Sequence, residues 1–329
     1  MRHEVRIPPA LHGQRLDQAL AALLPDYSRS RLKGWILGGR VRLEQAPNPA
    51  PRTRVAAGQR VVVDAEVEPL LADQPQPLPL AVVHEDPHCL IIDKPAGLVV
   101  HPGAGNRAGT LVNGLLHRWP ELAGLPRAGL VHRLDKDTSG LMLVARSLAA
   151  HTRLVQALQA REIRREYRAV CQGRVTAGGR IDAPVGRHPV QRTRMAVVSD
   201  GRPAVTHYRV LRRFERASFL ALRLETGRTH QIRVHLAHIG HPLIGDPVYA
   251  GRPWLPAGAS DALRSAVTGF RRQALHAARL GFQHPASGEP LEFAAPLPAD
   301  FRALLAALAG PGSAPGRFDD LQWPDQDSN

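Results

Sequence analysis

A short polar run that leads directly into an uninterrupted apolar run constrains this chain more than any other feature. Residues 131–140 contain two basic residues, two carboxylates and two hydroxyls, and residues 141–145 (Leu-Met-Leu-Val-Ala) are entirely apolar. The apolar run predicts a buried β-strand, and Gly140 allows the backbone to turn at the junction. A polar loop held against a buried strand is a suitable place to fix reactive side chains. Spacing alone leaves open the alternative of a polar turn with one ion pair.

Length and hydropathy restrict the class of protein. The chain has 329 residues, of which 43% are hydrophobic, so it can form two domains, one with a large core. No apolar run of about 18 residues predicts a membrane span, and the first residues lack the apolar segment of a secretion signal. We therefore expect a cytoplasmic protein. Cys89 and Cys171 each lie among apolar residues, which predicts two small buried side chains in a reducing compartment and no disulfide.

The net charge of +14 indicates a polyanionic partner, and nucleic acid is the first candidate. A membrane partner is not expected.

Residues 14–70 have the pattern of a small separate domain. Leucines at 16, 20, 23 and 24 share one helical face, and Ser28 is a candidate N-cap for a second helix that ends at Gly38 and Gly39. Residues 40–43 and 59–63 predict short strands. Arg29 and Lys33 lie one turn apart on the second helix, with Arg31 nearby, and form a basic edge. This arrangement resembles the S4 RNA-binding domain, which implies that the three side chains contact RNA. An ordinary solvated helix face is the alternative.

The rest of the chain divides into three parts. Residues 71–79 carry regularly spaced prolines and predict a semi-rigid linker. Residues 80–310 form the large domain, in which strands dominate and helices follow without a regular βαβ rhythm. The fold class that we expect is α+β with a mixed, mostly antiparallel sheet. Its main elements are strands at 89–93, 141–145, 167–171, 204–210, 219–225 and within 277–295, and helices at 110–119 and 148–159. Residues 311–329 are rich in Gly, Pro, Asp and Ser and should be disordered.

Residues 225–242 form a second dense polar stretch. Gly227 predicts a turn, Thr229 a helix N-cap, and residues 230–239 a helix that ends before Gly240. Arg233 falls on the packed face of this helix, so it needs a carboxylate partner, for which Asp135 and Asp137 are the candidates.

No metal site or cofactor site is predicted. Histidines 230, 235, 238 and 241 invite a zinc interpretation, but His230 and His235 fall on different faces, and no Cys or acidic ligand lies beside them. The chain contains no dinucleotide-binding or phosphate-binding glycine loop, and Ser139 lacks the pattern of a nucleophile elbow. We therefore expect chemistry without a cofactor.

Three segments together resemble the RluA-type pseudouridine synthases. They are residues 132–135 with 138–140, residues 165–170, and residues 227–235, in the family's order and spacing. The resemblance covers nearly the whole chain, and it implies a pseudouridine synthase catalytic fold after an S4-like domain. Residues 94–105 and 245–249 also resemble the family member that modifies the helix-69 stem-loop of large-subunit ribosomal RNA. The implied partner is ribosomal RNA or the precursor of the large subunit, bound by a monomer.

The resemblance assigns roles to particular residues. Asp135 is implied as the catalytic carboxylate, Arg233 as its charged partner, and Tyr167 as the ring that stacks on the target uracil. Arg133 is implied to fill the space that the flipped base leaves. Arg228 and His230 are implied to face the RNA backbone, in a surface extended by Arg161, Arg164, Arg165 and Arg168.

Two other hypotheses remain open at this point. One is a non-catalytic S4-type RNA-binding or ribosome-assembly protein, based on the S4-like domain and the positive charge. The other is a metal-dependent hydrolase built on the histidines.

Overall fold

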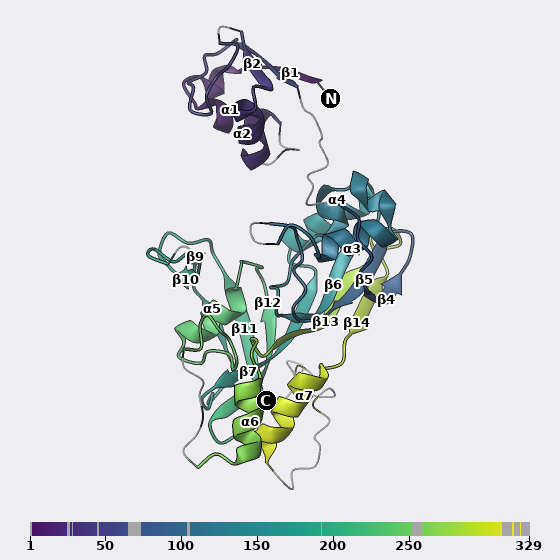
Figure 1. Cartoon of the computed structure of the whole chain (residues 1–329), viewed down its shortest axis with the longest axis vertical. Helices are drawn as coiled ribbons and strands as arrows, with labels where there is room; N and C mark the ends of the chain where they lie inside the picture. The colour runs from purple at the N-terminus through teal and green to yellow at the C-terminus, as the bar shows by residue number, and fades with distance from the viewer. Residues whose placement is uncertain are drawn as a thin grey trace. The chain divides into compact units, whose positions relative to one another are not determined.

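The chain forms two compact units, Met1–Leu70 and Leu71–Asn329, in a computed structural model (Figure 1). The structure describes residues 2–24, 27, 29–44, 46–64, 74–103, 106–191, 193–251, 255, 258–310, 318 and 323. Among these residues, no helix has the length and apolar character needed to cross a bilayer.

The first unit is a three-stranded antiparallel sheet packed with two helices. Its elements are β1 (Arg2–Arg6), α1 (Leu16–Leu23), α2 (Arg29–Leu37), β2 (Val41–Leu43) and β3 (Arg60–Asp64), with a 3₁₀ turn at Pro9–Leu11. The sheet order is β1-β3-β2. Leu16 and Leu20 of α1 and Leu32 of α2 enter one core with Val61 and Val63 of β3, which explains why the helical spacing was readable in the sequence.

One sequence prediction needs correction in this unit. The unit begins at β1, which pairs with β3, rather than at residue 14. The strand was missed because it alternates charged residues with half-buried ones and has little hydrophobic signal. The predicted N-cap Ser28 lies outside the described residues, as do the side chains of Arg29 and Arg31.

The second unit is organised around a nine-stranded sheet, as the α+β prediction requires. The order is β4-β5-β6-β13-β7-β12-β11-β8, with β14 paired to β13. The β6–β13 pair is parallel and the other pairs of this sheet are antiparallel, so the sheet is mixed and mostly antiparallel as predicted. Its strands are β4 (Ala81–Glu85), β5 (Cys89–Lys94), β6 (Ser139–Ala145), β7 (Arg164–Gln172), β8 (Gly179–Asp182), β11 (Val205–Arg213), β12 (Ala217–Leu224), β13 (Leu275–Gln283) and β14 (Pro290–Ala294). A separate hairpin joins β9 (Val185–Arg187) and β10 (Met195–Val197).

Helices lie around this sheet (Figure 1). They are α3 (Leu111–Arg118), α4 (Leu148–Gln159), α5 (Gln231–His238), α6 (Asp261–Gly269) and α7 (Ala299–Ala309), with 3₁₀ turns at Pro120–Gly124 and Pro126–Gly129. Side chains of Thr110 and Ser147 cap the first turns of α3 and α4, which fixes the starts of both helices. Cys89 and Cys171 are fully buried free thiols, as predicted.

The predicted linker is partly integrated into the second unit. The side chain of Asn113 in α3 donates to the carbonyl of Gln74, and the Gln76 amide donates to the carbonyl of Asn113. The Gln76 side chain also accepts from the Gly109 amide. Residues 74–79 are therefore fastened to α3 rather than forming a free spacer.

The predicted disordered tail, 311–329, falls mostly outside the described residues. Two of its aromatic residues are described, and both are packed. Phe318 is buried with its ring centre 6.0 Å from that of Phe219, and the Trp323 ring lies 4.3 Å from the Arg223 guanidinium. At these two positions, aromatic packing and a cation–π contact overcome the polar composition on which the prediction of disorder rested.

The polar loop enters the sheet at a crowded junction. Gly140 has φ = +111°, and a Cβ atom there would lie 2.2 Å from the carbonyl oxygen of Ala277 on β13. Only glycine fits between the loop and the neighbouring strand. Every residue of β6 is buried, so this strand is a fixed base for the loop that precedes it.

Lys94, at the end of β5, ties the same loop from its other side. Its side chain is fully buried, and Nζ donates to the carbonyl oxygens of Pro95, Leu98 and Lys136 at 2.8, 3.0 and 2.9 Å. Burial lowers the pKa of Lys94 to about 8. One ammonium therefore holds the loop that carries residue 136 against the turn after β5.

Replacing this ammonium should loosen the loop. We expect Lys94→Met to lower the free energy of unfolding by about 2–4 kcal/mol, because three carbonyls lose the buried ammonium that bonds them. Urea unfolding followed by circular dichroism measures this change. Lys136→Met is the control: its side chain is exposed, and its effect should stay within about 0.5 kcal/mol. Equal unfolding midpoints for the two variants would show that Lys94 does not hold the loop.

Candidate active site

A cavity of about 860 Å³ lies beside the polar loop. Its walls come from the loop itself, from β7 and from the segment between β12 and α5. Lining residues include His101, Arg127, His132, Arg133, Asp135, Arg161, Arg165, Tyr167, Glu225, Gly227, Arg228, His230, Arg233 and Leu275. The three segments singled out in the sequence thus meet around one space.

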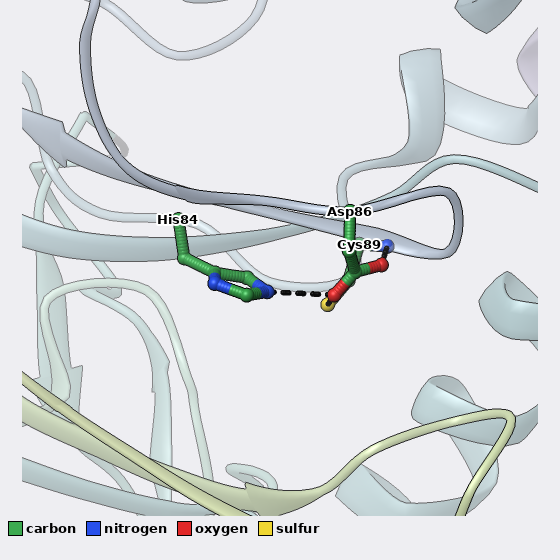
Figure 2. A group of neighbouring side chains, drawn as sticks. All are labelled: His84, Asp86 and Cys89. Carbon is green, nitrogen blue, oxygen red and sulfur yellow. Dashed lines mark hydrogen bonds and ion pairs between the residues drawn. The ribbon is translucent and has the colours of Figure 1, made fainter.

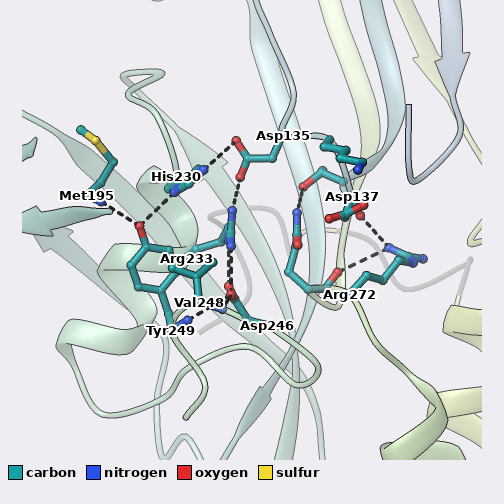
Figure 3. A network of polar contacts seen from close by, with 12 residues as sticks. Asp135, Asp137, Met195, His230, Arg233, Asp246, Val248, Tyr249 and Arg272 are labelled. Atoms are coloured by element: carbon teal, nitrogen blue, oxygen red, sulfur yellow. Dashed lines mark hydrogen bonds and ion pairs between the residues drawn. The ribbon is translucent and has the colours of Figure 1, made fainter. Parts of the chain in front are cut away.

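Arg233 is the centre of the polar network at this cavity (Figure 3). It is 4% exposed on α5, and its NH1 donates to Asp135 Oδ2 at 3.0 Å. Its Nε and NH2 donate to the two carboxylate oxygens of Asp246 at 2.7 and 2.9 Å. Burial by itself lowers the pKa of Arg233, but the hydrogen bonds and charge of Asp246, with those of Asp135, raise it above the ordinary value. The guanidinium is therefore charged and held in one orientation.

The network distinguishes the carboxylates that were candidates for this arginine. Arg233 binds Asp135, whereas Asp137 contributes its backbone carbonyl to Arg272 at 3.3 Å. Asp246 was not predicted as a partner. It is 2% exposed, and its Oδ1 also accepts from the amides of Val248 and Tyr249, so it closes a turn as well as an ion pair. The sequence singled out residues 245–249 only for their likeness to a family member, which did not reveal that Asp246 binds Arg233.

The rest of the loop is bonded to β13 and the residues just before it. The Thr138 amide donates to the Asp135 carbonyl, and Gln273 Nε2 donates to Thr138 Oγ1 at 3.0 Å. Ser139 Oγ hydrogen-bonds to His276 Nδ1 at 3.0 Å. These bonds fix the backbone around Asp135 while its carboxylate keeps 15% of its surface accessible at the cavity.

His230 lies beside the Asp135 carboxylate in a strained position. It has φ = +57° at the start of α5, and its Nε2 is 3.9 Å from Asp135 Oδ1. The Tyr249 hydroxyl accepts from the Met195 amide and contacts His230 Nδ1 at 2.9 Å. The hydroxyl proton is thus directed to Nδ1, which leaves Nε2 as the protonated nitrogen that faces Asp135. Burial lowers the pKa of His230, an effect that the charge of Asp135 opposes.

The predicted N-cap of this helix was wrong. The N-cap position is His230 rather than Thr229, and no side chain bonds from it. The Gln231 side chain instead fixes the turn that precedes the helix, because its Oε1 accepts from the Arg228 amide at 3.0 Å and from Thr226 Oγ1 at 2.8 Å.

Tyr167 forms part of the cavity wall from β7. It is 5% exposed, and burial raises the pKa of its hydroxyl, so the phenol keeps its proton at neutral pH. No described residue hydrogen-bonds to the hydroxyl. The ring is held by the core while its polar end has no partner within the described structure.

The candidate RNA-binding residues occupy different environments. Arg133 is exposed at the cavity rim, and Arg228 is half-buried with its Nε bonded to the Pro203 carbonyl. Lys33 is exposed on α2 of the first unit. Arg168, expected to extend the RNA surface, is instead 3% exposed and paired with Glu166. The sequence did not reveal this because β7 is buried along nearly its whole length.

The histidines of residues 230–241 do not form one ligand set. His235 Nε2 contacts the Ala183 carbonyl and its Nδ1 contacts Thr206 Oγ1, both at 2.9 Å, while His241 Nδ1 contacts the Gln172 carbonyl. Within the described residues, the group with metal-ligand character is elsewhere: the donor atoms of His84, Asp86 and Cys89 lie within 4.8 Å of one another (Figure 2).

Hydrogen bonds account for this second group. Asp86 Oδ2 lies 2.6 Å from His84 Nε2 and 3.2 Å from Cys89 Sγ, and its Oδ1 accepts from the amides of His88 and Cys89. Burial, aided by Asp86, raises the pKa of the Cys89 thiol to about 12, so the sulfur keeps its proton. The cluster has the properties of a bonded β4–β5 turn rather than those of a thiolate metal site.

Comparison with known proteins agrees with this geometry. A family model described as RNA pseudouridylate synthase matches residues 88–238. Ribosomal large subunit pseudouridine synthase D of Escherichia coli (strain K12) is 56% identical over 90% of this chain and 91% of its own length. The protein of the same name from Vibrio parahaemolyticus is 54% identical with the same coverage.

A solved human structure, RNA Pseudouridylate Synthase Domain Containing 4, has a TM-score of 0.56 and 27% identity, covering 69% of this chain and 92% of its own. The extent of identity to the bacterial relatives, together with the shared fold, shows that this chain belongs to the RNA pseudouridylate synthase family.

Proposed function

We propose that this chain converts uridine to pseudouridine in large-subunit ribosomal RNA, with Asp135 as the catalytic carboxylate. The main support for the proposal is the position of Asp135. Its carboxylate faces the cavity, and the buried, charge-paired Arg233 holds it there. The names of the bacterial relatives support the RNA class.

The reaction suits a site of this kind. Pseudouridine formation breaks the N1–C1′ bond, rotates the base and joins C5 to C1′; the C5 proton is released and N1 takes up a proton. It is an isomerisation and consumes no oxidant, reductant or energy donor. A carboxylate stabilises or captures the sugar while the base is detached. Attack at C1′, attack at the ring and assistance of glycal formation all use Asp135 in this position, and in each case the hydrogen bond from Arg233 holds the carboxylate there.

The target base must leave its helix to reach Asp135. Unstacking costs a few kcal/mol, and stacking on an aromatic ring contributes about 1–3 kcal/mol per base. Tyr167 offers such a ring within the cavity, and its unpartnered hydroxyl can hydrogen-bond a water molecule that carries the C5 proton away. Arg133 is exposed at the rim, which suits a side chain that fills the space left by the base.

We also propose that the first unit is an S4-like RNA-binding domain and that the enzyme works as a cytoplasmic monomer without a cofactor. Exposed Lys33 on α2 supports a role in RNA contact, with Arg29 and Arg31 assigned from the sequence pattern. Helix 69 is the proposed target, from the likeness of residues 94–105 and 245–249 to the enzyme that modifies it.

Removing the carboxylate charge tests the proposal. Asp135→Asn should lower the rate of tritium release from RNA labelled at uridine C5 by at least about a thousandfold, as for loss of other charge-stabilising groups, with RNA affinity within about threefold. Asp137→Asn is the matched control, since its side chain does not bind Arg233, and should keep nearly full activity. Full activity in Asp135→Asn would refute the catalytic assignment. A purely RNA-binding protein predicts that the Asp135→Asn substitution has no effect in any assay.

Mapping tests the target. Large-subunit ribosomal RNA from cells that lack the gene should lose pseudouridine at helix-69 positions, and the wild-type gene should restore it while the Asp135→Asn gene does not. Unchanged helix-69 modification in the deletion strain would overturn the choice of target but leave the chemistry to be tested in vitro.

A further inference from the structure

Four arginine side chains of the described structure are buried, and one of them differs from the other three. Arg168 pairs with Glu166, Arg233 with Asp246 and Asp135, and Arg272 with both carboxylate oxygens of Asp300. Arg165, on β7, is 8% exposed, and no described residue forms a hydrogen bond or an ion pair with it. A buried guanidinium without a counter-charge is unfavourable unless a ligand supplies one.

Arg165 lies in the wall of the catalytic cavity, together with Asp135 and Tyr167. Its Nε is buried without a partner. Two other buried side-chain nitrogens in the described structure share this condition, His101 Nε2 and His132 Nδ1, and both residues line the same cavity. The Leu143 amide donates to His132 Nε2, so the neutral ring carries its proton on Nδ1. Unsatisfied hydrogen-bonding groups therefore gather where a substrate would bind.

The two acidic residues that line the cavity already form ion pairs or hydrogen bonds with other residues. Asp135 is bound by Arg233, and Glu225 is bound by Arg161 and His207. Neither neutralises Arg165. The missing counter-charge has to come from the ligand.

Gly227 keeps room for this side chain. A Cβ atom at Gly227 would lie 2.9 Å from Arg165 NH1, closer than real Cβ contacts allow. The turn between β12 and α5 therefore leaves the guanidinium in place beside the cavity, and any larger residue would have to displace it.

We propose that Arg165 binds a backbone phosphate of the RNA strand next to the flipped uridine. This rests on the proposed function, because it takes the ligand to be RNA. A phosphate carries the charge that a buried guanidinium lacks, and its oxygens match the forked donors of arginine. A uracil carbonyl could accept a hydrogen bond but could not neutralise the charge. Arg165 thus anchors the backbone while Asp135 acts on the sugar, and it positions the nucleotide rather than taking part in bond breaking.

Arg165→Gln in the full chain separates this role from a structural one. RNA affinity should fall about tenfold, and the slope of log affinity against log salt should become shallower by about 0.7, the value for one phosphate on a single strand. The unfolding midpoint should stay the same or rise, because a buried charge without a partner is removed. Arg302→Gln, exposed on α7 and absent from the cavity wall, should change neither affinity nor midpoint. Arg168→Gln should lower the midpoint, since it leaves Glu166 buried.

A methylphosphonate scan identifies the phosphate. Neutral methylphosphonate is placed at each linkage flanking the target uridine, and binding is measured for the wild type and for Arg165→Gln. One linkage should weaken the wild type about tenfold and leave Arg165→Gln unaffected, because the contact is already lost. Any of three results would overturn the proposal. The affinity losses caused by the methylphosphonate and by Arg165→Gln could add at every linkage, Arg165→Gln could keep the wild-type affinity, or its unfolding midpoint could fall.

The two proposals fail separately. If the wild type converts uridine but the affinity losses from methylphosphonate and from Arg165→Gln add at every linkage, only the phosphate assignment fails. If the wild type binds the RNA, and one methylphosphonate linkage weakens the wild type but not Arg165→Gln, yet no pseudouridine forms, the proposed reaction fails and the phosphate contact stands. If the wild type does not bind the RNA, both are wrong.

Discussion

The site depends on one buried arginine that is shared by two carboxylates. Arg233 is held through two of its nitrogens by Asp246, and a third nitrogen is thereby directed at Asp135. An ion pair of one arginine and one aspartate could rotate as a unit. Two bonds to Asp246, which is itself fastened by the amides of Val248 and Tyr249, remove that freedom. The Asp135 carboxylate is therefore positioned by a partner that cannot move, and the remaining side of the carboxylate is left for the substrate.

The backbone around Asp135 is fixed by elements that are distant in the sequence. Lys94 from β5 holds the carbonyl of Lys136, Gln273 and His276 bond the side chains of Thr138 and Ser139, and Gly140 fits against Ala277. The large sheet brings these contacts together because β6 lies between β5 and β13. Much of the large sheet thus serves to present one short loop.

The sequence predicted correctly those helices and strands whose apolar residues recur at regular spacing. The strand after the polar loop and helix α4 were found because their apolar spacing is regular. The choice of Asp135 as catalytic, which the structure leaves as a proposal, came from motif resemblance. Features set by contacts between separate segments could not be read from the sequence: the pairing of Asp246 with Arg233, and the strand β1 that needs β3 as partner. Arg165 and Arg168 show the limit most clearly. They stand three residues apart on one strand, so they lie on opposite faces, Arg168 on the face of Glu166 and Arg165 on that of Tyr167. Alternation alone does not show that Arg165 lies in a cavity wall without a carboxylate partner.

The most direct test of this account is the single-turnover rate of Asp246→Asn, measured at saturating enzyme on RNA that contains the target uridine. The asparagine keeps the size of the side chain but cannot supply the second negative charge. If Asp246 fixes Arg233, and through it Asp135, the rate should fall about 100-fold while RNA affinity changes little, because misplacing a catalytic group by about 1 Å costs this much. Circular dichroism at the assay temperature establishes that the variant is folded. A folded Asp246→Asn enzyme with the wild-type rate would show that Asp135 needs no fixed arginine, and the account would be wrong.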